Sequence, residues 1–318
     1  MNTIEATAPP LPLATPRPLM KPLDTIQQRV RDWAELVKPR LTLMVLFTVA
    51  AGFVLASPGF LDWSLFLHAL LGTSLVAAGA SALNQYLERD TDARMRRTRN
   101  RPLPAGRLAP RAALRFGVLA ACGGLIYLSV LTNPLAAAMA ASTLVSYVFA
   151  YTPLKRISAW NTLGGAVPGA LPPVIGWTAA TGTLETGAGC LFLLLFLWQF
   201  PHFWAIAWLY RDDYARAGLK MVPTLDQEGG RMTGRFMVQS CIALIPVSLL
   251  PVYVHVAGPR YFWIALVLGA MFLAFAGRFL LQPSQERARH VLWASLLYLP
   301  VLLLALLWDG PFLGLAGT

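Results

Sequence analysis

Nine long runs of apolar residues follow one another along the chain, and polar segments separate them. The runs cover residues 41–58, 63–85, 112–131, 133–151, 161–181, 187–209, 234–256, 261–281 and 290–308. Each has about 18–24 residues, which is enough for an α-helix to cross the hydrocarbon core of a bilayer. The pattern therefore predicts an all-α polytopic membrane protein with nine transmembrane helices.

The fifth run, at residues 161–181, is the least regular. Two glycines and three prolines interrupt it: Gly164, Gly165, Pro168, Pro172 and Pro173. Proline is tolerated in a membrane helix where neighbouring groups satisfy the freed backbone atoms. We therefore expect a kinked span here.

The composition also indicates a membrane protein. Hydrophobic residues make up 56% of the 318 residues and charged residues 13%, against roughly 45–50% and about 25% in soluble domains. Cys122, Cys190 and Cys241 all lie inside predicted spans and form no CxxC pair. The sequence therefore predicts neither a disulfide framework nor a zinc site.

The basic residues are distributed unevenly between the two sets of connecting segments. If the N-terminus is cytoplasmic, the cytoplasmic segments hold 25 of the 26 lysines and arginines, and only Arg260 lies on the other side. Cytoplasmic segments of membrane proteins carry such an excess, so the distribution predicts an N-in, C-out orientation. It also accounts for the net charge of +11 without a nucleic acid partner, because the charge is shared among alternate loops.

The N-terminal segment differs in composition from the rest of the chain. It has few apolar clusters and is rich in proline, at positions 9, 10, 12, 16, 18 and 22. It also lacks the apolar core and cleavage site of a signal peptide. We predict a disordered, proline-rich cytoplasmic tail at residues 1–35 and a single nine-helix transmembrane domain at residues 36–318.

A polar stripe is predicted at the cytoplasmic end of the second span. If that helix continues past residue 85, Asn84, Glu88 and Asp92 follow one another at four-residue steps. Each step turns about 40° beyond a full circle, so the three side chains share one face. Amide and carboxylate oxygens suit a hard divalent cation that carries a phosphorylated ligand. The alternative is a solvated helix end with mixed charges.

A second acidic pair, Asp212 and Asp213, follows the sixth span on the same side of the membrane. We expect the two acidic clusters to converge over one cavity, where Mg²⁺ would bridge the carboxylates and a diphosphate. Lys155, four residues after Tyr151, is a candidate to neutralise the leaving diphosphate. An ordinary positive-inside anchor is the alternative for Lys155.

These residues resemble the motifs of the UbiA superfamily of intramembrane prenyltransferases. The similarity rests on Asn84-x-x-x-Glu88-x-x-x-Asp92, on the sequence Arg-Thr-Arg-Asn-Arg-Pro-Leu-Pro at 97–104, and on Tyr151-x-x-x-Lys155. The resemblance implies a nine-helix bundle with two aspartate-rich motifs. It also implies Mg²⁺ as the cofactor for the use of a polyprenyl diphosphate.

The resemblance assigns roles to individual residues. The implied catalytic residues are Asn84, Glu88, Asp92, Lys155 and Asp213. The implied metal ligands are Glu88, Asp92, Asp212 and Asp213, and the implied diphosphate-binding residues are Arg97, Arg101, Tyr151 and Lys155. The chain departs from the family pattern at Glu88, where many members carry Asp. It also lacks the DxxxD spacing in the second motif, because Leu209 stands four residues before Asp213.

Three further stretches, at residues 169–177, 197–204 and 212–223, resemble the branch of the superfamily that farnesylates haem. This resemblance implies transfer of farnesyl from farnesyl diphosphate to a vinyl group of haem B, with addition of water, to give haem O. It implies a bacterial inner-membrane protein with the lipid bilayer and haem A synthase as candidate partners. The implied haem-binding residues are Trp198, Gln199 and His202. A continuous helix would place His202 and Asp213, eleven residues apart, on one face.

Other function classes remain open from the sequence. Within the superfamily, the acceptor could be another aromatic compound such as 4-hydroxybenzoate. A secondary transporter also has broken helices, although its ionisable residues lie near the middle of the membrane. A haem chaperone would bind haem without requiring the acidic stripe.

Overall fold

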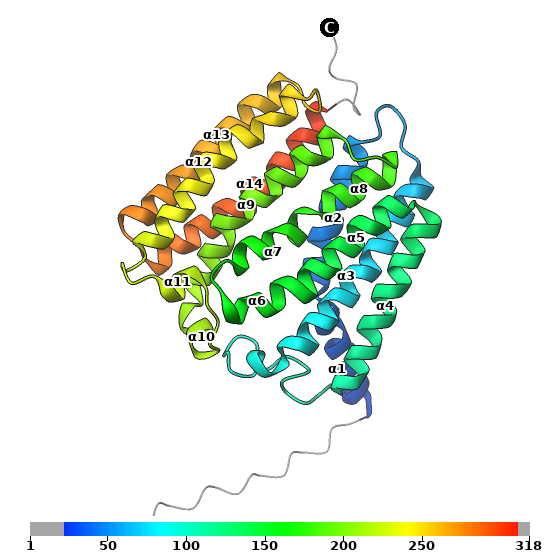
Figure 1. Cartoon of the computed structure of the whole chain (residues 1–318), viewed down its shortest axis with the longest axis vertical. Coiled ribbons are helices and arrows are strands. Elements are labelled where there is room, and N and C mark those ends of the chain that lie inside the picture. Colours follow the sequence, from blue (N-terminus) through cyan, green and yellow to red (C-terminus); the bar gives the residue numbers. More distant parts are fainter. Residues whose placement is uncertain (1–21, 311–318) are drawn as a thin grey trace, which may run out of the picture.

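The chain forms a bundle of helices that stand side by side (Figure 1). The computed structural model describes residues 22–310, and these contain helices and turns but no strand. The elements are α1 (Pro22–Val37), α2 (Pro39–Leu55), α3 (Trp63–Asp92), α4 (Pro110–Leu131), α5 (Pro134–Val145), the π-helix η1 (Ser146–Tyr151), α6 (Thr152–Ile157), α7 (Asn161–Ala170), α8 (Pro172–Thr181), α9 (Thr186–Leu209), α10 (Arg211–Arg216), α11 (Val222–Leu225), α12 (Arg231–Tyr253), α13 (Pro259–Leu281) and α14 (Gln285–Asp309). The predicted all-α class is confirmed.

Most predicted spans are present as single long helices. Within residues 22–310, seven helical segments are long and apolar enough to cross a membrane: α3, α4, the segment from α5 to α6, α9, α12, α13 and α14. The number becomes eight if α1 and α2, which meet at 42°, form one bent span. The predicted fifth span corresponds to α7 and α8, which meet at Leu171 and have ten residues each. Neither is long enough to cross alone, so the count of nine stays a prediction.

The prediction of a disordered tail is wrong for residues 22–35, because α1 covers them. The described side chains explain why this helix is held. Leu36 is fully buried in a cluster with Ala82 of α3, and Trp33 packs edge-on against Phe116. The buried carboxylate of Asp32 accepts a 2.8 Å hydrogen bond from Arg107. Residues 1–21 of the predicted tail lie outside the described residues.

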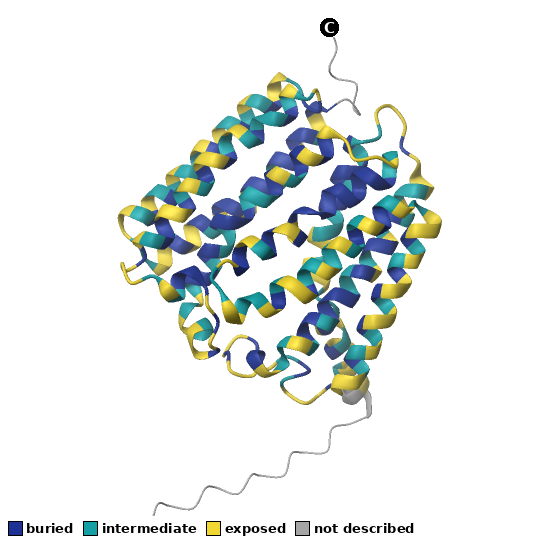
Figure 2. Cartoon of the chain, in the orientation of Figure 1, coloured by how far each residue is buried: buried dark blue, intermediate teal, exposed yellow. Residues whose placement is uncertain are grey.

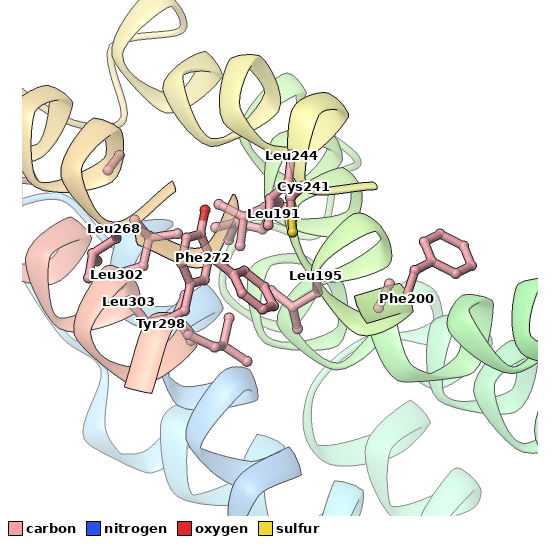
Figure 3. Close-up of a cluster of buried hydrophobic side chains, with 14 of the residues drawn as sticks. Leu191, Leu195, Phe200, Cys241, Leu244, Leu268, Phe272, Tyr298, Leu302 and Leu303 are labelled. Atoms are coloured by element: carbon pink, nitrogen blue, oxygen red, sulfur yellow. The ribbon is translucent and has the colours of Figure 1, made fainter. Parts of the chain in front are cut away.

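The largest buried cluster lies between α9, α12, α13 and α14 and extends to α2, α7 and α8. Figure 3 shows Leu191 and Leu195 of α9 facing Phe272 of α13 and Tyr298 of α14, and the last two rings lie 5.4 Å apart. Exposed residues lie mainly on the outer helices (Figure 2), and many of the exposed side chains are large and apolar. An apolar outer surface is the pattern of a protein whose solvent is lipid.

The segments that carry most basic residues gather at one end of the bundle. Figure 1 shows α1, the end of α3, α6, α10 and α11 at its lower end, whereas α14 finishes at the upper end. This arrangement brings the two predicted acidic clusters to the same end of the molecule. The side of the membrane on which this end lies stays a prediction.

Candidate active site

The polar stripe of α3 forms as the sequence predicts, because α3 continues without a break to Asp92. Asn84 is 2% exposed and Asp92 is 1% exposed, so neither is a solvated residue at a helix end. The side-chain amide of Asn84 donates to Oγ1 of Thr152 at 3.1 Å, and its Oδ1 accepts from Nζ of Lys38 at 3.3 Å. Asn84 therefore joins α3 to α6 and to the start of α2.

Lys38 reaches Asn84 from a strained backbone position. It lies between α1 and α2 with φ 51° and ψ 63°, the left-handed region that a residue with a Cβ adopts at a cost of about 1–2 kcal/mol. Such strain persists where surrounding structure holds the residue in place, often at functional sites. The sequence-based list of site residues omits Lys38. Its position before Pro39, at the start of a span, was the available signal.

Glu88 forms an ion pair with Lys155 across 67 residues of sequence. The distance from Nζ to Oε1 is 2.7 Å, and both side chains are about six-sevenths buried, with 15% and 14% exposed. Lys155 also lies over the ring of Tyr151, with Nζ 4.3 Å from the ring centroid. The structure thus brings together three of the predicted residues, and Lys155 is more than an anchor at the membrane surface.

The irregular segment η1 aims these residues at α3. The next helix contains Pro153, which has no N–H to donate and whose ring crowds the preceding turn, so the regular hydrogen-bond ladder cannot pass through it. Within η1, the Tyr147 and Tyr151 rings stack with centroids 5.9 Å apart. The Thr152 hydroxyl, which accepts from Asn84, donates to the Tyr147 carbonyl at 2.9 Å. The π-helical turn thereby connects to the polar stripe.

Asp92 pairs with Arg101 from the loop that follows α3. Its Oδ2 accepts from the Arg101 guanidinium at 2.7 Å, and its backbone carbonyl accepts from the Thr98 hydroxyl at 2.9 Å. These bonds fold the arginine-rich loop back onto the end of the helix. The other carboxylate oxygen, Oδ1, is buried and has no hydrogen-bond partner among the described residues. Burying a carboxylate oxygen without a hydrogen-bond partner costs folding free energy. A cation, or a hydrogen-bond donor of a ligand, would supply the missing partner.

The second acidic cluster does not continue the face of α9. That helix ends at Leu209, the chain turns at Tyr210, and Asp213 lies in the separate short helix α10. The prediction that His202 and Asp213 share one helix face is therefore wrong. The physical reason is that the Tyr210 carbonyl accepts from the N–H groups of both Asp213 and Tyr214, which starts a new helix.

Asp213 nevertheless meets the loop that follows the first cluster. Its Oδ2 accepts from the backbone N–H of Arg97 at 3.4 Å, and its Oδ1 pairs with Arg216. The Arg97 guanidinium lies over the Tyr210 ring, 5.0 Å from its centroid. By contrast, the Asp212 side chain is 84% exposed, and its one ion pair within residues 22–310 is with the adjacent Arg211, at 3.8 Å. The structure therefore connects Asp213, and not Asp212, to the arginine-rich loop.

The carboxylates do not converge on one point in the described residues. Residues 22–310 contain no group of three or more His, Cys, Asp or Glu side chains placed to hold a metal ion. Each acid instead neutralises a cation: Glu88 with Lys155, Asp92 with Arg101, and Asp213 with Arg216. The donor chemistry suits Mg²⁺, because carboxylate oxygens are its preferred protein ligands. The unpartnered Oδ1 of Asp92 is the atom best placed to accept it.

Two cavities of about 340 and 330 Å³ adjoin the stripe between α3 and α6. Glu88 and Thr152 line one of them, and Thr91 and Arg156 line both. The Arg156 guanidinium donates to the Thr91 hydroxyl. Sequence reasoning missed this pair. Thr91 lies seven residues after Asn84, a step that returns to nearly the same helix face, and that spacing was the available signal.

The predicted haem-binding residues lie deeper in the bundle, on α9. The side-chain amide of Gln199 donates to the Ala166 carbonyl of α7 at 3.2 Å and to the Leu195 carbonyl at 3.0 Å. Trp198 and His202 stack with ring centroids 4.9 Å apart and contact α14.

Outside the spans, burial raises the pKa of Tyr214 above its usual value, so this phenol stays neutral beside the second acidic cluster.

The sequence and the fold both have known counterparts. The profile of the UbiA prenyltransferase family matches residues 45–299. A protein named protoheme IX farnesyltransferase from Solibacter usitatus (strain Ellin6076) is 46% identical over 291 residues, 89% of this chain and 99% of its own. A protein of the same name from Koribacter versatilis (strain Ellin345) is 45% identical over 309 residues, 94% of this chain and 97% of its own.

Solved structures share the fold at low sequence identity. A structure described as digeranylgeranylglyceryl phosphate synthase superposes with a TM-score of 0.75 at 17% identity, covering 90% of this chain and 99% of the other. A UbiA homolog from Archaeoglobus fulgidus bound to GPP and Mg²⁺ superposes with a TM-score of 0.56 at 16% identity, covering 87% and 99%. At these identities the superpositions establish the helical architecture.

Proposed function

This chain belongs to the UbiA prenyltransferase family, and we propose that it transfers the farnesyl group of farnesyl diphosphate to a vinyl group of haem B, with addition of water, to give haem O. The acceptor is supported by relatives named protoheme IX farnesyltransferase that are 45–46% identical over about nine-tenths of the chain. The same names agree with the acceptor predicted from the three haem-type stretches of the sequence.

The observation that carries the proposal is the alternation of buried acids and cations at the end of α3. Glu88 with Lys155 and Asp92 with Arg101 are pairs at 2.7 Å whose members are mostly withdrawn from water. Burying such pairs costs desolvation energy that their mutual attraction repays only in part. These pairs suit a site that binds a metal cation together with an anionic diphosphate. On binding, each acid would exchange its basic partner for the metal, and each basic residue would exchange its acid for the diphosphate.

We propose that Glu88, Asp92, Asp212 and Asp213 hold Mg²⁺, with Asp92 and its free Oδ1 as the central ligand. A solved family member with GPP and Mg²⁺ supports this cofactor. When bound, Mg²⁺ would neutralise the diphosphate and withdraw electron density from the oxygen attached to the farnesyl group. Asp212 would have to move, because its side chain points into solvent in this structure.

The cations freed from the acids would bind the diphosphate. Lys155, Arg101 and Arg97 provide donors, Tyr151 lies beneath Lys155, and Asn84 keeps α3, α6 and Lys38 in register. As the allylic C1–O bond breaks, both electrons leave with the diphosphate, and these residues stabilise the growing negative charge. The electron pair of the haem vinyl group forms the new carbon–carbon bond. Water then adds to the resulting cation and loses a proton.

We place haem B at the α9 residues Trp198, Gln199 and His202. Trp198 and His202 offer a flat aromatic surface with a ring nitrogen, which suits a porphyrin and its iron. Gln199 contributes by fixing α7 against α9, because both of its donor contacts are to backbone carbonyls. The neighbouring helices would exclude water from the reactive farnesyl cation until the vinyl group has attacked it.

Mass spectrometry of the reaction tests the proposal. Purified protein in detergent is incubated with haem B, farnesyl diphosphate and Mg²⁺, and each component is omitted in turn as a control. We expect a haem product heavier by one farnesyl group and one water, formed only in the complete mixture. A prenylated product from 4-hydroxybenzoate and none from haem B would overturn the acceptor, and haem binding with no product under any condition would indicate a chaperone.

We also propose that the protein works in the cell membrane of a bacterium. The apolar helices support a membrane location, and the relatives come from bacteria. The product of the proposed reaction is a substrate for an enzyme that oxidises haem O, so haem A synthase is the proposed partner. Co-purification of the two proteins from a mildly solubilised membrane would test the partnership.

A further inference from the structure

His202 of α9 and Ser295 of α14 form a hydrogen bond whose direction can be deduced. The distance from Nδ1 to Oγ is 2.7 Å, and Ser295 is fully buried. The Ser295 hydroxyl has one hydrogen, and it donates that hydrogen to the Leu292 carbonyl at 2.6 Å. A carbonyl can only accept, so Oγ must accept from the imidazole. Nδ1 of His202 therefore carries the proton.

Two further contacts fix the plane of the His202 ring. The Trp198 indole stacks on the imidazole with an interplanar angle of 22°. The indole is itself held because its Nε1 donates to the backbone carbonyl of Ser295 at 2.9 Å. Ser295 of α14 therefore restrains the His202 ring in two ways. Its hydroxyl oxygen accepts from the ring directly, and its carbonyl holds the Trp198 indole that stacks on the ring.

The second ring nitrogen of His202 remains available. With the proton on Nδ1, Nε2 of a neutral ring carries a lone pair. Nε2 has no hydrogen-bond partner within residues 22–310. It is also not fully enclosed by the surrounding protein atoms. Helical geometry places His202 between Trp198, which contacts α14, and Gln199, which contacts α7. Nε2 is therefore an accessible lone pair on the part of α9 that lies between its contacts with α14 and α7.

We propose that Ser295 is a positioning residue that holds His202 as the Nδ1–H tautomer, so that Nε2 binds the iron of the substrate haem B. This inference rests on the proposed function, since it assumes that haem B is the acceptor. Histidine ligands of metals usually donate their other ring N–H to a neighbouring acceptor, which sets the tautomer and the ring orientation. Here the acceptor is a hydroxyl oxygen whose own hydrogen is already committed.

The test titrates detergent-solubilised, full-length protein with ferric haem B, followed by optical absorption and electron paramagnetic resonance of the iron. We expect His202→Ala to lose the nitrogen-ligand signature. Ser295→Ala should weaken haem binding about 10–100-fold and alter that signature, while farnesyl diphosphate affinity stays unchanged. Ser295→Thr, which keeps the hydroxyl, should restore haem binding. Ser248→Ala is the matched control, because Ser248 is also fully buried and donates to the Ile245 carbonyl at 2.7 Å.

A second measurement needs no variant at Ser295. Nitrogen NMR of protein labelled at its four histidines, assigned with His202→Ala, should show His202 protonated at Nδ1 and bare at Nε2. A proton on Nε2 would overturn the inference, as would unchanged haem affinity and spectrum in Ser295→Ala. Equal losses of haem and farnesyl diphosphate binding in Ser295→Ala and Ser248→Ala would also overturn it. If the unaltered protein neither binds nor farnesylates haem B, the proposed function itself fails.

Discussion

At the scale of single residues, each polar side chain of the α3 stripe is paired with a cation from outside that helix. Glu88 meets Lys155 from α6, Asp92 meets Arg101 from the following loop, and Asn84 meets Lys38 from the start of α2. Removing one charge of a buried pair leaves the other uncompensated, so stability must be measured beside activity. Asn and Gln keep the shape and one acceptor oxygen of the acid, which limits the disturbance to the lost charge.

Asp92→Asn and Glu88→Gln should leave the protein folded but lower farnesyl transfer at least about 100-fold, the scale for losing a key electrostatic contact. Asn84→Ala should act in the same direction with a smaller loss. Turnover is measured at saturating Mg²⁺, alongside thermal unfolding. Asp90→Asn is the control, because Asp90 lies on the same helix end but its side chain is 75% exposed. Near-normal turnover of Asp92→Asn would remove it from the metal site.

Lys38 allows backbone strain and side-chain chemistry to be separated. Lys38→Gly removes the amine near Asn84 and also relieves the left-handed conformation, which glycine adopts without cost. We expect activity to fall about 10-fold or more while the thermal unfolding midpoint is maintained or raised. Lys38→Met, which keeps an unbranched apolar chain and the strain, should lose activity to the same extent. Full activity of Lys38→Gly would show that the amine has no part in the reaction.

At the scale of elements, breaks between helices decide which residues meet. The turn at Tyr210 separates Asp213 from α9 and brings it to Arg97, and the π-helical turn before Pro153 directs Lys155 toward Glu88. Close contact between α3 and α4 provides the rigid support for the stripe. A Cβ added to Gly124 of α4 would lie 2.8 Å from the backbone nitrogen of Val76 of α3.

Gly124→Ala should destabilise the bundle by about 1–3 kcal/mol, because the added methyl group overpacks the α3–α4 contact. The neighbouring Gly123 provides the control, since a Cβ there meets nothing within 4 Å. Gly123→Ala should be neutral or slightly stabilising, because alanine favours helix over glycine. Unfolding of both variants is followed in the same detergent. Equal stability of the two would show that α3 and α4 are not closely packed at this level.

At the scale of the whole molecule, the charged end and the apolar walls define how the bundle sits in a membrane. Reporters fused after residues 108 and 228 should be cytoplasmic, and one fused at the C-terminus should lie on the opposite side. The reason is that 25 of 26 basic residues fall in alternate connections. A cytoplasmic C-terminus would mean an even number of crossings, and α7 and α8 would then form a re-entrant hairpin.

The sequence alone determined the helical class, most of the spans and the acidic stripe, since each depends on local periodicity. An apolar run of sufficient length must satisfy its backbone internally in lipid, and that requirement leaves few alternatives to a helix. The Asn84, Glu88 and Asp92 stripe followed from four-residue spacing in one continuous helix, and α3 is continuous through it.

Tertiary structure decided the contacts between segments far apart in the chain. Local spacing does not encode the pairing of Glu88 with Lys155, the proximity of Lys38 to Asn84, or the Ser295 hydroxyl beside His202. The two wrong predictions about helix boundaries have the same origin. Residues 22–35 become helical because Leu36 and Trp33 pack on other segments, and α9 stops at Tyr210 because its carbonyl starts a new helix. In both segments the alternative local conformations are similar in energy. Packing against other segments decided the first, and competition for backbone hydrogen bonds decided the second.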